Sequence, residues 1–317
     1  MIEVQLKKGK EKSLLRRHPW VYDTAVGRVA GKPDSGETVK VTAADGRFLG
    51  YGAYSPKSTL RVRMWSFDEA ENTEVPEFLR ARLEKAVKAR EGLLARTTAR
   101  RIVFGEADGI PGLIVDQYGD WLVTQFQSAG TERRRDEIVA DLMAMTGAKG
   151  LFDRSDAATR QREGLAVHTG VLAGEEPPEL IEVVEDGVKY GVNVRLGHKT
   201  GFYVDQRESR LAAQQLARDF EKTHGRKMRA LNCFCYTGGF SLALALGGAA
   251  EVVSVDSSAE ALAQAKRNAD LNGFAEAQMK WVEADVFAYL REARERGETF
   301  DLVILDPPKF ASSHFHV

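Results

Sequence analysis

The amino-acid sequence predicts an α/β protein of several domains, in which a β-rich barrel and a small α+β domain precede a parallel sheet covered by helices. Three observations support this prediction. The 317 residues are too many for one ordinary domain. The first 65 residues contain short β-branched and apolar runs without a long helical pattern. From about residue 181 onward, strand patterns alternate with helical patterns, which is typical of a parallel sheet with right-handed crossovers.

The composition is that of a globular protein with material for a sizeable core. Hydrophobic residues make up 43% of the chain and charged residues 29%. The first residues lack the apolar stretch of a secretory signal peptide, and no apolar run is long enough to cross a membrane. The two cysteines, Cys233 and Cys235, stand too close for a structural disulfide, and the scattered histidines lack metal-ligand spacing. We therefore expect a cytoplasmic protein that binds neither a membrane nor a metal.

Residues 1–70 are predicted to form the β-rich barrel. Residues 39–43 and 60–65 have the β-branched and apolar character of strands, and an Ala-Asp-Gly turn follows the first of them.

The same module carries an excess of positive charge. Residues 1–65 hold thirteen Lys and Arg against six Asp and Glu, whereas the whole chain has a net charge of −1. Two pairs of neighbouring cations create a local positive field that suits the phosphate backbone of RNA. These cations are Lys7, Lys8, Arg16 and Arg17. An ordinary solvated surface explains the charge equally well, so charge alone does not decide between the two.

Residues 71–180 are predicted to contain a linking helix and the small α+β domain. Apolar residues recur at helical spacing over residues 76–95, and a second helical pattern covers residues 132–145. The expected strands are residues 102–104, 112–116, 121–126 and 150–153. A Gly-Glu-Glu-Pro-Pro stretch at residues 174–178 predicts the boundary to the next domain.

Residues 181–317 are predicted to form the parallel sheet. The expected strands are residues 228–232, 251–256, 278–285 and 300–306, and the expected helices are residues 238–246, 258–271 and 286–296. This alternation brings the carboxyl ends of the strands together at one edge, where open α/β sheets bind ligands.

Polar residues stand at the ends of all four of these strands. The first strand runs into a turn from Asn232 to Phe240 that contains two glycines, which let a ligand approach the backbone and the N–H groups of the next helix. The dinucleotide fingerprint G-x-G-x-x-G is absent, which disfavours NAD and FAD. Asp256 is placed to accept hydrogen bonds from ribose hydroxyls, and Asp285 from an adenine amino group. Asp306 opens an Asp-Pro-Pro-Lys-Phe string whose prolines hold a rigid turn. Taken singly, such an acid is more often a helix cap.

In this order and spacing, residues 195–310 resemble a class I S-adenosylmethionine-dependent methyltransferase. More narrowly, the whole chain is similar to the bacterial large-subunit (23S) rRNA cytosine-5 methyltransferase family, which carries an N-terminal PUA domain. The strings that carry the resemblance are RHPWVY at 17–22, LGYGAYSP at 49–56, LRVR at 60–63, EADGIPGLIVD at 106–116, RSD at 154–156, EGL at 163–165 and KTGFYVDQR at 199–207. The resemblance implies a PUA RNA-binding barrel, a central α+β domain and a Rossmann-like methyltransferase sheet. It also implies S-adenosylmethionine as the cofactor and large-subunit rRNA as the partner, and it leaves a homodimer open.

The resemblance also implies roles for individual residues. The cofactor loop would consist of Asn232, Phe234, Thr237 and Gly238. Asp256 would hold the ribose and Asp285 the adenine, while Asp306, the candidate catalytic residue, would hold the methionine end or the target base. The residues that would cover the cofactor are Tyr203, Asp205, Gln206 and Arg207, for which a capped helix start is the plainer interpretation. Lys309 would meet an RNA phosphate and Phe310 would stack on a flipped base, unless Phe310 belongs to the core.

The sequence departs from this family in one respect. Transfer to C5 of cytosine needs a cysteine thiolate that attacks C6, and in the family this cysteine lies after the fifth strand. The sequence ends at Val317, just past the fourth strand, and Cys233 and Cys235 lie in the cofactor loop. We therefore expect an incomplete methyltransferase sheet and a 317-residue chain that is inactive toward C5. We also expect the fourth strand to be an aggregation-prone edge.

Three functions remain open from the sequence. The first is methyl transfer to cytosine C5 of large-subunit rRNA. The second is transfer to a guanine nitrogen, because related domains with an Asp-Pro-Pro-x-Phe string do this without a cysteine. The third is a non-catalytic protein that binds RNA and the cofactor.

Overall fold

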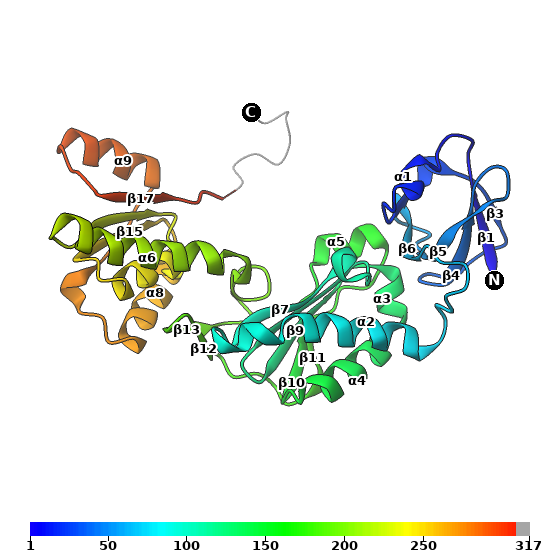
Figure 1. Cartoon of the computed structure of the whole chain (residues 1–317), viewed down its shortest axis with the longest axis horizontal. Coiled ribbons are helices and arrows are strands. Elements are labelled where there is room, and N and C mark those ends of the chain that lie inside the picture. Colours follow the sequence, from blue (N-terminus) through cyan, green and yellow to red (C-terminus); the bar gives the residue numbers. More distant parts are fainter. Residues whose placement is uncertain (309–317) are drawn as a thin grey trace. The chain divides into compact units, whose positions relative to one another are not determined.

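The computed structural model describes residues 1–308, which form two compact units (Figure 1). The first unit comprises Met1–Ile181 and Asn193–Phe202. The second comprises Glu182–Val192 and the described chain from Tyr203 onward. No helix within residues 1–308 combines the length and the apolar character that a membrane crossing requires.

The N-terminal part of the first unit is a six-stranded sheet with the strand order β2-β6-β5-β4-β1-β3. Its strands are β1 Ile2–Leu6, β2 Trp20–Tyr22, β3 Val26–Ala30, β4 Thr38–Thr42, β5 Phe48–Tyr54 and β6 Leu60–Ser66. Alternate side chains point inward, so that Val39 and Val41 of β4 are fully buried whereas Lys40 between them is half-buried. The helix in this part, α1 (Lys12–Leu15), has four residues. The predicted β-rich module is therefore confirmed.

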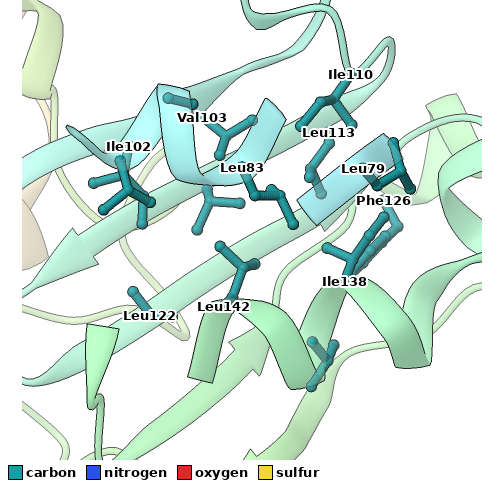
Figure 2. Packing of buried hydrophobic residues seen from close by; sticks show 14 of the residues in the cluster. Leu79, Leu83, Ile102, Val103, Ile110, Leu113, Leu122, Phe126, Ile138 and Leu142 are labelled. Atoms are coloured by element: carbon teal, nitrogen blue, oxygen red, sulfur yellow. The ribbon is translucent and has the colours of Figure 1, made fainter. Parts of the chain in front are cut away.

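The rest of the first unit is built on a five-stranded sheet with the order β11-β10-β9-β8-β7. Its strands are β7 Ala99–Phe104, β8 Leu113–Tyr118, β9 Trp121–Phe126, β10 Gly150–Asp153 and β11 Gly170–Gly174. Helices α2 (Pro76–Ala89) and α4 (Arg135–Thr146) bury their apolar stripes in a shared core with this sheet (Figure 2). Among its buried residues are Leu79, Leu83, Ile102, Leu122, Ile138 and Leu142. The four strands predicted in this region are confirmed.

The helix predicted over residues 76–95 is shorter than expected. It ends at Ala89, and residues Glu91–Ala95 form a 3-10 turn instead. Gly92, a poor helix former, lies in this turn, and Leu94, which was expected on the buried face, is 52% exposed.

A buried carboxylate joins helix α5 (Ala157–Glu163) to the N-terminal part of the first unit. Glu163 ends this helix and is 3% exposed. It accepts hydrogen bonds from the hydroxyls of Ser55 (2.9 Å) and Ser58 (2.7 Å), and it pairs with Arg63 at 3.0 Å. Because all three partners belong to the N-terminal part, these contacts link it to the central part, as do Ala53 and Trp65, which lie in the same core cluster as α2 and α4.

The second unit contains a parallel sheet with the order β16-β15-β14-β17. Its strands are β14 Arg229–Cys233, β15 Glu251–Asp256, β16 Met279–Glu283 and β17 Leu302–Leu305. Its helices are α6 Arg207–His224, α7 Gly239–Leu246, α8 Ala259–Leu271 and α9 Val286–Glu295. The predicted alternation is confirmed, with the first strand central between the second and the fourth.

A two-stranded hairpin, β12 (Ile181–Glu185) and β13 (Val188–Val192), lies outside the parallel sheet. Both residues of its turn have positive φ, 46° at Asp186 and 89° at Gly187, as a tight hairpin requires. The sequence pattern does not predict this hairpin.

Candidate functional site

The turn between β14 and α7 holds an unusual backbone. Phe234 has a φ of 56°, Tyr236 of 51° and Gly238 of 83°. Left-handed conformations at two aromatic residues are strained, and such strain persists only where neighbouring structure enforces it. Here β15 enforces it, because the N–H of Cys235 donates to the carbonyl of Val255 at 3.1 Å and the N–H of Tyr236 donates to Oδ2 of Asp256 at 2.8 Å.

Both glycines of the turn lie where a side chain would be crowded. A Cβ on Gly238 would lie 3.0 Å from the Trp281 ring, and a Cβ on Gly239 would lie 3.2 Å from Cδ of Arg210. Gly238 is also the N-cap of α7 and supplies no capping side chain. The turn therefore brings bare backbone and the positive end of a helix to the carboxyl edge of the sheet, a suitable place for a polar ligand.

Asp256 stands beside this turn, at the end of β15. Its Oδ2 accepts from Tyr236 N, and its Oδ1 accepts from Ser258 N at 2.9 Å. Each carboxylate oxygen can accept more than one hydrogen bond. Asp256 can therefore hold the turn in place and still accept from the hydroxyls of a bound ribose.

The acids at the two other strand ends have different surroundings. Asp285 is the N-cap of α9, where its Oδ1 accepts from Ala288 N at 2.8 Å. Asp285 therefore does cap a helix, as such an acid commonly does. The cap engages one oxygen of its exposed carboxylate. Asp306 is exposed, and its Oδ2 accepts from Nε2 of Gln206 at 3.0 Å.

The segment from Tyr203 to Arg207 lies beside the turn, as the prediction of a cofactor cover requires. The ring of Tyr203 meets that of Tyr236 edge to face, with 5.8 Å between the centroids. Burial raises the pKa of the Tyr203 phenol, and the nearby Tyr236, Asp205 and Asp306 raise this pKa further. Arg207 begins α6 and pairs with Glu208 at 3.3 Å. The structure therefore brings the cover residues, the turn and Asp306 together.

Two predicted loop residues have structural contacts. Asn232 is 1% exposed, and its amide donates to Ser241 Oγ at 2.9 Å, so its side chain lies beneath the turn. The carbonyl of Thr237 accepts from Nδ2 of Asn268 at 3.0 Å. Asn268 on α8 is also 1% exposed and was missed in the sequence, where one Asn in a helical pattern carries no signal of a distant contact.

Neither cysteine has the surroundings of a nucleophile. Cys233 is fully buried, and burial raises the pKa of its thiol to about 11. Cys235 is 5% exposed, and burial together with the negative charge of Asp256 raises its pKa as well. At neutral pH both side chains are thiols, whereas nucleophilic attack requires a thiolate.

The predicted RNA-binding cations of the first unit lie on its surface. All four are exposed: Lys7, Lys8, Arg16 and Arg17. Arg17 follows the C-cap of α1 and places its guanidinium 5.2 Å from the centroid of the Phe67 ring. Lys309 and Phe310 lie outside the described residues.

The charges at the carboxyl edge of the parallel sheet restrict the ligand. Three strand ends at this edge carry a carboxylate, namely Asp256, Asp285 and Asp306. They would attract a ligand with hydroxyls, amino groups and positive charge. S-adenosylmethionine, which has a ribose, an adenine, a sulfonium and an ammonium but no phosphate, fits this arrangement.

Two protein families match the chain. Residues 4–67 match the PUA-like domain, and residues 131–317 match the S-adenosylmethionine-dependent methyltransferases. The chain is 47% identical to ribosomal RNA large subunit methyltransferase I of Aeromonas hydrophila and 48% identical to that of Photobacterium profundum. Each match extends over 313 residues and covers 98% of this chain and 77% of the relative.

Solved structures agree with this result. SMU.776, assigned as a methyltransferase and determined in complex with SAH, superimposes with a TM-score of 0.81 at 25% identity. The match covers 98% of this chain and 77% of that one. A protein from Streptococcus mutans assigned as a SAM-dependent methyltransferase gives a TM-score of 0.78 at 25% identity, over 97% of this chain and 77% of that one.

Proposed function

Because the chain belongs to the S-adenosylmethionine-dependent methyltransferase family that includes ribosomal RNA large subunit methyltransferase I, we propose that it methylates large-subunit ribosomal RNA, with cytosine C5 as the leading target. The observation that carries this proposal is the strained turn after β14, held by Asp256 at the carboxyl edge of the sheet. The match to a PUA-like domain and the exposed cations beside α1 support RNA as the substrate. We place this activity in the cytoplasm.

The cofactor supplies an electrophilic methyl group, and the residues of the chain hold and orient it. Asp256, which already accepts from Tyr236 N, would also accept hydrogen bonds from the ribose hydroxyls. Asp285 would accept a hydrogen bond from the adenine amino group with the carboxylate oxygen that does not cap α9. Asp306 would accept a hydrogen bond from an amino group, either that of the methionine end or that of the target base. The segment from Tyr203 to Arg207 closes the site from the other side, while Gln206 fixes the Asp306 carboxylate.

Transfer to cytosine C5 needs one further group. A thiolate must add to C6 to make C5 nucleophilic, and Cys233 and Cys235 are buried thiols with raised pKa values. The thiolate for this target must therefore come from a cysteine other than these two. The burial of both cysteines favours a guanine nitrogen as the second candidate target. Such a nitrogen has a lone pair and needs no covalent activation by a thiolate.

The decisive experiment removes the gene from its host and analyses the nucleosides of large-subunit rRNA by mass spectrometry. We expect one 5-methylcytidine to disappear and the wild-type gene to restore it, whereas a gene that encodes Asp256→Ala should not. Loss of a methylguanosine instead would reject cytosine in favour of guanine. If no methylated nucleoside of the rRNA changes, both targets are rejected and a non-catalytic binding protein is favoured.

A further inference from the structure

Arg210 occupies an unusual position for a charged side chain. It lies on α6 and is 4% exposed. Its Nε and Nη2 donate to the two carboxylate oxygens of Glu185 at 2.7 and 3.0 Å, and Glu185, at the end of β12, is 2% exposed. A buried ion pair of this kind is a poor source of stability, since desolvation of both charges offsets most of their attraction. It does fix directions, because a planar guanidinium donates at set angles.

The side chain of Arg210 contacts two sides of the candidate cofactor site. Its Nη2 also donates to the carbonyl of Tyr203 at 2.9 Å, at the start of the cover segment. Its Cδ lies against Gly239, where even a Cβ would be only 3.2 Å away, at the start of α7. The side chain of Arg210 thus links the hairpin, the cover segment (residues 203–207) and Gly239, the first residue of α7.

The hairpin supports the turn at two more points. The hydroxyl of Tyr190 on β13 donates to the carbonyl of Gly239 at 3.3 Å. The N–H of Gly191 donates to Oδ1 of Asn268 at 2.9 Å, and Asn268 in turn donates to the Thr237 carbonyl. The hairpin, which adds no strand to the parallel sheet, therefore contacts the turn directly at Gly239 and through one side chain at Thr237.

We propose that Glu185 and Arg210 are positioning residues that hold the Tyr203 carbonyl, and with it the cover segment, against the cofactor turn and thereby set the affinity for the cofactor. We call the Glu185–Arg210 pair the brace; the hairpin of β12 and β13 carries its Glu185. The proposal rests on the cofactor placement given under the proposed function, and it assigns to the pair a role beyond stability.

Two variants separate positioning from folding. Replacing both buried charges by apolar groups, in E185L/R210M, keeps the core filled without an unpaired charge, so we expect cooperative melting within a few degrees of the parent. Arg210→Lys keeps the charge, but a single ammonium cannot serve both Glu185 oxygens and the Tyr203 carbonyl in the same geometry. Arg226→Lys is the matched control, since Arg226 makes a bidentate pair with Asp301 in the same unit but is exposed.

Two measurements are made on each purified variant. Calorimetry with SAH should give about tenfold weaker binding for E185L/R210M and for Arg210→Lys, as expected for a lost charge-assisted hydrogen bond, and unchanged binding for Arg226→Lys. Hydrogen exchange without ligand should rise at the amide of Gln206, which donates to the Tyr203 carbonyl at 3.2 Å, and stay unchanged within α8.

The proposal would be overturned if E185L/R210M bound SAH as tightly as the parent and showed the same hydrogen exchange at Gln206. Glu185 and Arg210 would then have a purely structural role. If the parent itself binds no SAH, the cofactor placement fails. The exchange at Gln206 then still decides whether the brace holds the cover segment.

Discussion

The side-chain amide of Gln206 donates a 3.0 Å hydrogen bond to Oδ2 of Asp306, across 100 residues of sequence. Gln206 lies in the 3-10 turn Val204–Gln206 that precedes α6, and Asp306 follows β17 at the carboxyl edge of the sheet. The bond joins the cover segment to the strand end that we assign to the reacting groups. The position of this segment and the orientation of the Asp306 carboxylate therefore depend on each other.

A double-mutant cycle tests this coupling. Gln206→Ala and Asp306→Ala should each weaken SAH binding, and the double variant should lose less than the sum of the two. We expect a coupling energy of about 0.5–1.5 kcal/mol, the usual contribution of one hydrogen bond. Isothermal calorimetry on the four proteins measures it. Strictly additive losses would show that the two side chains act independently.

The exposed cations of the first unit predict RNA binding that depends on salt. If four phosphates are neutralised, affinity for a structured rRNA fragment should fall about 100-fold between 50 and 200 mM salt. Reversing charge at Lys7, Lys8, Arg16 and Arg17 should weaken binding to any RNA sequence alike and flatten this dependence. Lys149→Glu serves as the control, because Lys149 is an exposed lysine of the same unit that pairs with Asp120. An affinity indifferent to salt would refute the phosphate contacts.

Thiol chemistry provides a test that depends on pH. Burial raises the pKa of Cys233 to about 11, so its reactive thiolate is scarce at neutral pH and should appear only as the pH approaches that value. In the folded protein at pH 7–8 we expect neither cysteine to react with a thiol reagent within minutes, whereas both should react in denaturant. Rapid alkylation of Cys233 or Cys235 in the native state would contradict this account.

The exposed apolar side chains of strand β17 lead us to expect that copies of the 317-residue chain associate with one another. Within residues 1–308 it pairs with β14 alone, and Val303 and Leu305 are 45% and 58% exposed. An apolar strand with an unpaired edge recruits other strands. Val303→Lys should therefore lower light scattering at high protein concentration, whereas Leu216→Lys, at an equally exposed apolar site on α6, should not. Equal scattering by both variants would exclude the strand as the cause.

The sequence predicts the parallel sheet well because its signals are local. Strand β15 occupies the expected residues 251–256. The position of Asp256 at the carboxyl edge of the sheet is predictable because Asp256 is the last residue of this strand. Helix α2 was expected to be longer, since the apolar spacing continues to Leu94 although the helix ends at Ala89. Periodicity marks a face and not the residue at which a helix stops.

The parts of the site that the sequence did not predict depend on distant contacts. The brace of Glu185 and Arg210 joins two residues 25 positions apart, in a hairpin and a helix whose packing no local pattern specifies. Asn232 was assigned to the cofactor loop, and only the structure shows its amide turned to Ser241 in the interior. Local sequence gives the order of the strand ends, whereas the direction of each side chain depends on packing.

The binding of SAH to the parent, to Asp256→Ala and to Asp301→Ala, measured by calorimetry, tests the central claim most directly. Asp256 lies at the carboxyl edge of the sheet beside the strained turn, whereas Asp301 precedes β17 at the opposite edge and pairs with Arg226. We predict one SAH per chain for the parent and a loss of about 1.5–3 kcal/mol for Asp256→Ala, the usual contribution of a hydrogen bond to a charged group. For Asp301→Ala we predict unchanged affinity. An Asp256→Ala variant that is folded and binds SAH as tightly as the parent would contradict the account.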